Sequence, residues 1–231
     1  MKLIIVGATG FVGKELLRQS LQRSDITSVV AVSRRALPPG TSAKLRSVIV
    51  KDYDQYTEEA KKEFAGANAC IWTIAITPSK SSAVPWDEVV RVCQTSALVG
   101  LRAIYESGVA KPFRHIYMSG VAAERDQSKT PSFKPKYSLM RGETESQVLA
   151  FANEHPGEIE ATVAKPGLIT EPWNIPKRAF ATVLGWTVSL PSIYVGQIAT
   201  AMLDQVVNGI EKDPLLNVDL VRIADDLART S

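Results

Sequence analysis

The first 120 residues alternate short apolar runs with longer segments in which apolar residues recur at helical spacing. This alternation is typical of βαβ units, which build a parallel sheet with helices on its faces. The run ACIWTIAI at 69–76 is apolar throughout, as expected of a strand covered on both faces. The other predicted strands of this half are 2–6, 28–33, 47–51 and 115–118, and the predicted helices are about 11–23, 58–64 and 85–108.

The second half continues the pattern as far as Pro166 and then departs from it. Prolines and tryptophans crowd the region just beyond Pro166, which predicts a small cap over the sheet. The later predicted elements are a helix at about 137–153 after a polar loop, strands at 161–164 and near 215–218, and a final helix at 219–229.

A stretch without any charged side chain runs from Ala179 to Leu203. Its length would suffice to cross a bilayer. However, polar residues and glycines interrupt it, and Pro191-Ser192 divides it into two pieces of ordinary helix length. We expect two buried helices, with membrane association through 179–203 as the alternative.

Composition and charge narrow the class of protein. The 231 residues carry 27 Lys+Arg and 24 Asp+Glu, a net charge of +3 that is spread along the chain, so nucleic acid is not an expected partner. Apolar residues make up 45% and charged residues 22%, as in folded globular domains. The apolar run at the N-terminus is too short for a signal peptide, and a cytoplasmic protein is expected.

The cysteines and histidines do not form a metal-binding pattern. Cys70 and Cys93 each lie within an apolar segment, which predicts reduced, buried thiols. His115 and His155 stand alone, so no zinc site and no other metal site is expected.

A glycine-rich turn, G-x-x-G-x-x-G, follows the first predicted strand and opens the first predicted helix. Glycines there let the backbone approach a pyrophosphate, and the free N–H groups of the helix N-terminus meet its charge. We therefore predict a doubly wound parallel α/β fold of the Rossmann type in one domain, with a dinucleotide-binding core at 1–165. Residues 166–231 then form a small C-terminal substrate cap with the last strand and helix. The predicted cofactor contacts of this turn are Gly7, Thr9, Gly10, Phe11, Val12 and Gly13.

The end of the second strand indicates which dinucleotide is bound. An NAD site carries an Asp or Glu there for the ribose 2′-hydroxyl, whereas this chain has Ser33-Arg34-Arg35. Two guanidinium groups and a hydroxyl suit a 2′-phosphate, so the predicted cofactor is NADP(H). Further cofactor contacts are predicted at Asp52 and Tyr53 beside the adenine, and at Ile74, Ala75 and Ile76 beside the pyrophosphate and the nicotinamide ribose.

These motifs, together with Ser119, Tyr137-Ser-Leu-Met-Arg141 and Lys165-Pro166-Gly167, resemble the short-chain dehydrogenase/reductase superfamily. More narrowly, the chain resembles the atypical, NmrA-like branch that includes the human Tat-interactive oxidoreductase-like proteins and fungal relatives. The segment that follows Tyr137, Arg141-Gly142-Glu143-Thr144-Glu145, is similar to that branch as well.

The resemblance implies roles for individual residues. Ser119 would hydrogen-bond a substrate carbonyl, Tyr137 would give or take the proton, and the superfamily's lysine falls on Arg141. Positions 137 and 141 share a helix face, so Arg141 can still lower the pKa of Tyr137 and hold the nicotinamide ribose. An arginine cannot lose its proton and cannot pass one onward. The helix-four asparagine of many members falls on Cys93, a second departure.

The remaining expectations concern the nicotinamide and substrate side. Lys165, Pro166, Gly167 and Leu168 are expected to line the nicotinamide pocket, and Gly120 and Trp173 to contact the substrate. The expected function is NADP(H)-dependent hydride transfer to or from a small hydrophobic carbonyl compound, beneath a lid formed by 166–180. Two alternatives use the same fold: an NADP(H)-binding sensor or regulator without turnover, and a non-redox isomerase or epimerase.

Overall fold

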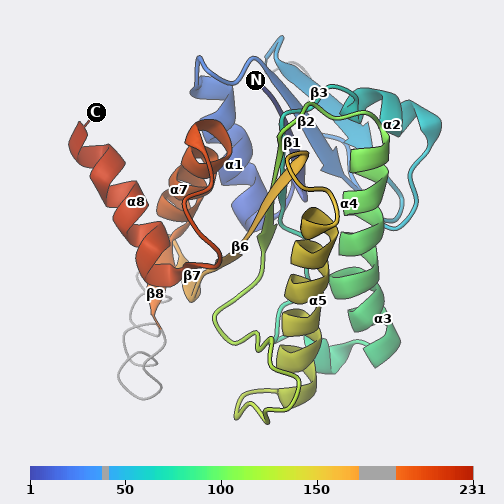
Figure 1. The fold of residues 1–231 in the computed structure, drawn as a ribbon, viewed down its shortest axis with the longest axis vertical. Helices are drawn as coiled ribbons and strands as arrows, with labels where there is room; N and C mark the ends of the chain where they lie inside the picture. Colours follow the sequence, from blue (N-terminus) through green and yellow to red (C-terminus); the bar gives the residue numbers. More distant parts are fainter. Residues whose placement is uncertain (38–41, 172–190, 231) are drawn as a thin grey trace.

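The computed structural model describes residues 1–37, 42–171 and 191–230. Within them, seven parallel strands form one sheet in the order β3-β2-β1-β4-β5-β6-β9 (Figure 1). The chain therefore winds outward from β1 to β3 and then crosses back to β4, which confirms the predicted doubly wound fold. The strands are β1 (Lys2–Val6), β2 (Ser28–Ser33), β3 (Leu45–Ile49), β4 (Ala69–Trp72), β5 (Phe113–Met118), β6 (Ile159–Lys165) and β9 (Leu215–Leu216).

Helices cover both faces of the sheet (Figure 1). Side chains alternate along each strand, so that on β1 Leu3 and Ile5 enter one apolar core while Ile4 and Val6 enter the other. The first core is closed by α1 (Phe11–Gln22), α7 (Val195–Asn208) and α8 (Asn217–Thr230), and the second by α2 (Glu58–Phe64), α4 (Ser96–Glu106) and α5 (Pro135–Asn153).

Two predicted elements of the first half are wrong in extent. Strand β4 ends at Trp72, four residues early, because its partner β1 ends at Val6, whose carbonyl accepts the N–H and the hydroxyl of Thr73 as the last bonds between the two segments. Residues 73–76 thus leave the sheet above the glycine turn. The single helix predicted at 85–108 is three segments: α3 (Trp86–Val90), a π-helical turn at Arg91–Thr95 and α4. Such turns are rare and often mark functional sites.

The C-terminal part also differs from the prediction. The second predicted helix does not begin directly after Pro191, because Ser192–Tyr194 is a strand (β8) that pairs in parallel with β7 (Leu168–Thr170). Helix α7 begins only at Val195, where Gln197 accepts a hydrogen bond from the Tyr194 N–H (3.2 Å). The predicted final strand is shorter than expected, since α8 already begins at Asn217.

Helices α7 and α8 pack against the central sheet. The prediction that residues 166–231 form a cap is therefore wrong for these two helices. Ile198 and Met202 of α7 and Leu220 of α8 lie buried in the same core as Leu3 of β1. Strands β7 and β8 form a separate two-stranded sheet, whose Ile193 is buried in the same core. The first half of the uncharged stretch, 179–190, lies outside the described residues. The described helices include none that is both long and apolar enough to span a membrane.

Candidate functional site

The glycine turn lies at the carboxyl end of β1, beside β4, where the strand order reverses. Open α/β sheets bind their ligands at this point. Gly7 has φ +92°, and a Cβ there would lie 2.4 Å from Thr73 Oγ1. A Cβ at Gly13 would lie 2.1 Å from the Gly7 carbonyl oxygen. The backbone of the turn is therefore packed so closely that only glycine fits at these two positions.

Helix α1 presents a free N-terminus beside this turn. Gly10 is the N-cap and provides no side-chain cap, and the first turn holds no acidic residue. The Gly10 N–H itself closes the turn by donating to the Gly7 carbonyl (2.8 Å). Uncapped N–H groups and the positive end of the helix dipole favour a bound anion such as a phosphate. Of the predicted contacts here, Phe11 is exposed, Thr9 is half-buried and Val12 is buried.

The turn after β2 exposes two cations. The buried Ser33 hydroxyl donates to the Arg35 carbonyl (2.6 Å), so its proton is used inside the turn rather than left for a phosphate. Arg34 and Arg35 are exposed, and among the described residues neither forms an ion pair. The Arg34 guanidinium lies 6.0 Å from the centre of the Tyr53 ring. Two guanidinium groups that lack ionic partners, close to the glycine turn, suit the binding of an additional phosphate.

The neighbouring carboxylates are already paired with another cation. Arg91, in the π-helical turn, contacts Asp52 (3.3 Å), Asp54 (3.2 Å) and Glu88 (2.7 Å). Asp52, predicted as an adenine contact, therefore has an arginine partner from the opposite side of the site. Tyr53 is buried and packs edge-on against Trp72. The sequence analysis did not single out Arg91, because its three partners come from two separate segments.

Residues 74–76 are held in place by the helices beside them. The Ile76 N–H donates to Cys93 Sγ (3.2 Å), and the Tyr137 hydroxyl donates to the Ile76 carbonyl (2.8 Å). Ala75 packs in the same small apolar cluster as Tyr137, and Ile74 lies next to Gly7. The segment predicted to border the nicotinamide ribose thus lies between the glycine turn and the predicted catalytic tyrosine. Cys70 and Cys93 are both free and buried, as predicted.

Tyr137 is a neutral phenol in this setting. Burial raises its pKa to about 12, and the nearby positive charge of Arg141 opposes that shift only in part. At neutral pH the hydroxyl therefore carries its proton and can donate it.

Arg141 lies one helical turn after Tyr137 and is 3% exposed. Its guanidinium donates to the Met118 carbonyl (2.8 Å), to the Cys93 carbonyl (3.5 Å) and to the Tyr117 hydroxyl. It also stands over the Tyr117 ring, 4.8 Å from its centre. No carboxylate of the described residues pairs with it. Arg141 is thus a buried, unneutralised cation that ties β5, α5 and the π-helical turn together.

Ser119 follows β5 directly, and its N–H donates to the Ala164 carbonyl (2.8 Å). Its hydroxyl oxygen is buried and has no hydrogen-bond partner among the described residues. Buried polar atoms are almost always satisfied, so this oxygen marks a position where a ligand or a water would bind. Gly120 accepts a hydrogen bond from the Ala123 N–H (3.0 Å) in the turn that follows.

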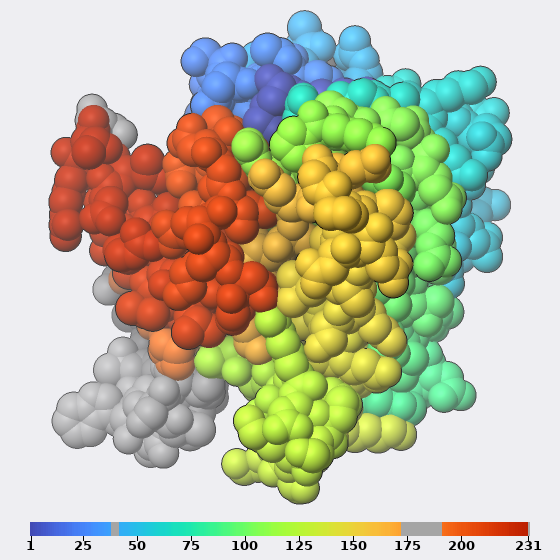
Figure 2. Space-filling model, in the orientation of Figure 1, coloured from blue at the N-terminus to red at the C-terminus, as the bar shows by residue number. Residues whose placement is uncertain are grey.

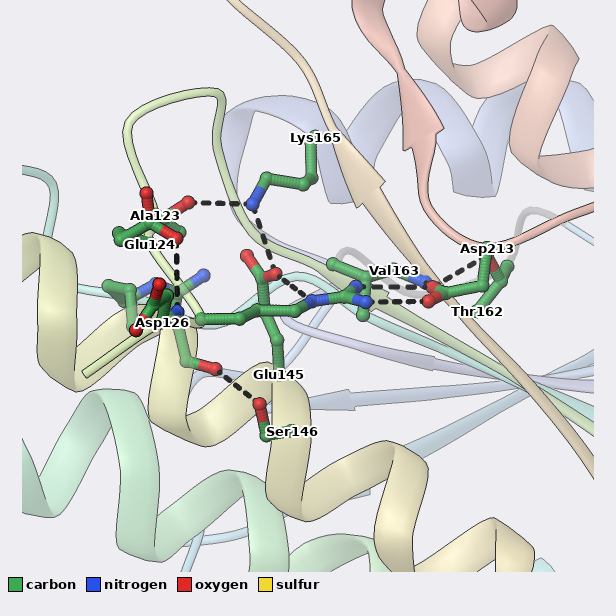
Figure 3. Close-up of polar contacts among 12 residues, drawn as sticks. Ala123, Glu124, Asp126, Glu145, Ser146, Thr162, Val163, Lys165 and Asp213 are labelled. Carbon is green, nitrogen blue, oxygen red and sulfur yellow. Dashed lines mark hydrogen bonds and ion pairs between the residues drawn. The ribbon is translucent and has the colours of Figure 1, made fainter. Parts of the chain in front are cut away.

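Hydrogen bonds hold the end of β6 and the residues that follow it. Lys165 Nζ donates to the Ala123 carbonyl (2.7 Å) and to Glu145 Oε2 (3.1 Å), as Figure 3 shows. The Pro166 carbonyl accepts a hydrogen bond from Val121, and the Gly167 N–H donates to Asn217 Oδ1 (2.8 Å). Leu168 is exposed and begins β7. Trp173 lies outside the described residues.

Sequence analysis missed a buried ionic network in this region (Figure 3). Glu145, 0% exposed, accepts hydrogen bonds from Lys165 and from Arg125 Nε (2.8 Å). Arg125 also pairs with Asp213 (2.7 Å), which accepts a hydrogen bond from the Val163 N–H (2.9 Å). One signal was available, because Glu145 lies four residues after Arg141 and therefore on the same helix face.

The segment between β5 and α5 projects from the molecule at this end (Figure 2). It carries two exposed apolar side chains, Val121 (39%) and Phe133 (53%). The loop is held against α5 at Gly142, where a Cβ would lie 1.7 Å from the Glu124 carbonyl oxygen. Two exposed apolar side chains therefore lie on the loop that leads from Ser119 to α5.

Comparisons with known proteins support the fold. No protein-family model matches the chain. A Leucinostatins biosynthesis cluster protein T from Purpureocillium lilacinum is 35% identical over 71 residues, which is 30% of this chain and 26% of that protein's length. DesIV from Streptomyces venezuelae, a dTDP-glucose 4,6-dehydratase solved with NAD bound, is similar in structure with a TM-score of 0.71 and 15% identity, over 99% of this chain and 81% of that one. UDP-glucose 4-epimerase from Thermotoga maritima matches with a TM-score of 0.68 and 15% identity, over 99% and 83%. The chain thus has the Rossmann-like parallel α/β fold of these enzymes.

Proposed function

We propose that this protein is an NADP(H)-dependent oxidoreductase of the short-chain dehydrogenase/reductase type. The observation that carries the proposal is the glycine turn, in which a Cβ at Gly7 or Gly13 would collide with the backbone or side chains of the site. That turn lies at the strand-order reversal and beside the uncapped N-terminus of α1. The residues present therefore fit a dinucleotide, whose pyrophosphate needs close backbone approach and N–H donors.

The preference for NADP(H) rests on Arg34 and Arg35. Neither guanidinium has an ionic partner among the described residues, while the nearby carboxylates Asp52 and Asp54 are paired with Arg91. No carboxylate follows β2 to accept the ribose 2′-hydroxyl of NAD, and a 2′-phosphate would supply the missing counter-charge. DesIV, by contrast, was solved with NAD.

The bound nicotinamide would supply a hydride to a carbonyl carbon of the substrate, or accept one from the carbon that bears the hydroxyl in the corresponding alcohol. Tyr137 keeps its proton at neutral pH and donates it to the carbonyl oxygen, for which its hydroxyl must leave the Ile76 carbonyl. The unpartnered Ser119 hydroxyl donates a second hydrogen bond to that oxygen. Arg141 contributes a fixed positive charge and holds the Met118 carbonyl, immediately before Ser119.

We propose a small carbonyl compound with an apolar body as substrate. The exposed side chains of Val121, Phe133 and Leu168 supply apolar surface around the end of the sheet where Ser119 lies. A small-molecule substrate is consistent with the charge of the chain, which provides no basic stripe for nucleic acid.

Two alternatives are favoured by specific observations. The hydrogen bond from Tyr137 to Ile76 and the burial of Arg141 among protein carbonyls suit a regulator that binds NADP(H) without turnover. The structural likeness to UDP-glucose 4-epimerase favours an isomerase or epimerase that uses the same Tyr and Ser. Both retain the cofactor site, and both differ from the reductase in that no cofactor is consumed.

The test measures NADPH consumption with a panel of aldehydes, ketones and quinones, after NADPH binding has been measured by fluorescence. We expect turnover by the wild type and a loss of about 100-fold or more in Tyr137→Phe, the size of effect expected for a general acid. NADPH affinity should stay nearly unchanged. Tyr105→Phe is the matched control, because Tyr105 bonds Glu158 at the other end of the helices and lies away from the glycine turn. Binding without consumption would favour the regulator or the epimerase over the reductase, and an absence of NADPH binding would contradict all three functions.

A further inference from the structure

Ser119 and Lys165 are neighbours on adjacent strands. The register pairs Met118 of β5 with Ala164 of β6, and the Ser119 N–H continues the ladder by donating to the Ala164 carbonyl. Because side chains alternate along a strand, Lys165 projects to the same side as Val163, which faces the core beneath α5. Lys165 reaches Glu145 of α5 on that side. Ser119, Lys165 and Glu145 therefore form one contiguous group.

Each of the three has unused hydrogen-bonding capacity. The Ser119 hydroxyl and Glu145 Oε1 are both buried and lack partners within the described residues. Lys165 Nζ has three N–H groups, and its bonds to Ala123 and Glu145 use two of them in the described part of the chain. Leaving such groups buried and unpaired costs free energy. A bound molecule that forms hydrogen bonds with them removes this cost, which favours its binding.

The chemistry of these groups specifies the ligand that would satisfy them. An ionised Glu145 can only accept hydrogen bonds, so its free oxygen needs an O–H or N–H from the ligand, whereas Ser119 and Lys165 can each donate to an oxygen. Lys165 and Arg125 face Glu145 and Asp213 (Figure 3), and Arg141 adds a positive charge that pairs with no carboxylate of the described residues. A group with a carbonyl oxygen and a neighbouring hydroxyl fits, whereas a carboxylate has no hydrogen to donate to Glu145 Oε1.

We infer that Ser119, Lys165 and Glu145 form a recognition site for a substrate whose carbonyl carbon is next to a hydroxyl-bearing carbon. The inference rests on the proposed function and specifies its substrate class. Ser119 donates to the carbonyl oxygen, Lys165 donates to the hydroxyl oxygen, and Glu145 Oε1 accepts the hydroxyl proton. Arg125 acts as a positioning residue, because it holds Glu145 from the side opposite Lys165.

The experiment uses three probes with the same phenyl ketone body: acetophenone, α-hydroxyacetophenone and benzoylformate, which replaces the hydroxymethyl group by a carboxylate. Each is titrated calorimetrically into the protein saturated with NADP⁺. We expect α-hydroxyacetophenone to bind at least about tenfold more tightly than acetophenone, the effect of one well-placed hydrogen bond to a charged group. Benzoylformate should bind no more tightly than acetophenone.

Two variants test whether these residues cause the preference. In Glu145→Gln and in Lys165→Met the ratio between the hydroxylated and plain ketones should fall to within about twofold. Lys165→Met keeps the Glu145–Arg125 pair, so it remains informative where Glu145→Gln fails to fold, and thermal melting checks both.

Several results would overturn the inference: equal binding of the two ketones, no binding of either, tighter binding of benzoylformate, or an unchanged ratio in the variants. Failure of the proposed function has a different signature, because the wild type would then not bind NADP⁺ in the preceding titration. In that case the three probes are titrated into the protein alone, and the ratio of the affinities for α-hydroxyacetophenone and acetophenone tests the recognition site.

Discussion

Replacing Gly13 with alanine should separate helix α1 from the turn that precedes it. The new Cβ would lie 2.1 Å from the Gly7 carbonyl oxygen and 2.9 Å from Ala8 Cα, whereas ordinary contacts begin near 3.4 Å. Both neighbours are backbone, so the helix must move by more than an ångström. Overpacking of this kind costs about 1–3 kcal/mol. For a chain of this size the melting temperature should fall by about 2–12 °C.

The same displacement moves the N–H groups of α1 away from the phosphate position. We therefore expect Gly13→Ala to weaken NADPH binding at least about tenfold, a change of about 1.4 kcal/mol. Thermal melting measures the first effect, and NADPH fluorescence titration at a fixed salt concentration measures the second.

Gly196→Ala is the matched control. Gly196 lies in α7, and its Cβ would meet Glu15 Oε1 at 3.8 Å, an ordinary contact. This variant should melt at the same temperature or higher, because alanine favours a helix by up to about 1 kcal/mol over glycine. NADPH affinity should be unchanged. A Gly13→Ala protein with the melting temperature and NADPH affinity of the wild type would refute the reasoning.

Three further predictions concern other parts of the molecule. Removing both guanidinium groups in Arg34→Ala/Arg35→Ala should weaken NADPH binding by about tenfold or more while NADH binding changes by less than about twofold, measured by fluorescence titration; an equal loss for both cofactors would contradict the 2′-phosphate assignment. His115 is buried, and burial lowers its pKa to about 4 from 6.5. Below pH 6.5 the unfolded chain binds a proton that the folded protein does not, so the free energy of unfolding should fall by about 3 kcal/mol as the pH drops to about 4. Urea denaturation of the wild type and His115→Leu across this range checks it, and parallel pH dependences would count against it. Gly142→Ala should lower the melting temperature, because its Cβ would lie 1.7 Å from the Glu124 carbonyl oxygen. An unchanged melting temperature would show that the segment between β5 and α5 moves aside without loss of stability.

The sheet and the cofactor turn could be predicted because their signals are local. The strand β1 is a continuous apolar run followed directly by the glycine turn, and both appear in the structure where the sequence predicts them. The same holds for β2, which ends in Ser33 before two arginines. Local signals failed beyond Trp72, where the apolar run continues but the partner strand β1, far away in the sequence, ends at Val6.

The parts that could not be predicted depend on contacts between distant segments. The Pro- and Trp-rich composition beyond Pro166 predicted a cap over 166–231, yet α7 packs on the sheet beside α1. Strand β8 follows a proline that is typical of a helix break, and only its pairing with β7 makes it a strand. The buried network of Glu145, Arg125 and Asp213 joins three segments whose charges look like ordinary surface residues in the sequence.

The hydrogen-bond partners of Tyr137 and Arg141 in the site also could not be predicted from the sequence. Their spacing correctly places both on one face of α5, where both are buried. The spacing does not indicate that Tyr137 bonds the Ile76 carbonyl or that Arg141 bonds the Met118 carbonyl. Those partners come from segments after β4 and at the end of β5, which only the folded chain brings together.

The central claim is that the glycine turn and Arg34-Arg35 together bind NADP(H). It is tested most directly by titrating the wild-type protein with NADPH and with NADH under the same buffer and salt, and following the fluorescence of each cofactor. We expect saturable binding of both, with a Kd for NADPH at least about tenfold lower than for NADH. Binding of neither cofactor, or tighter binding of NADH, would contradict it.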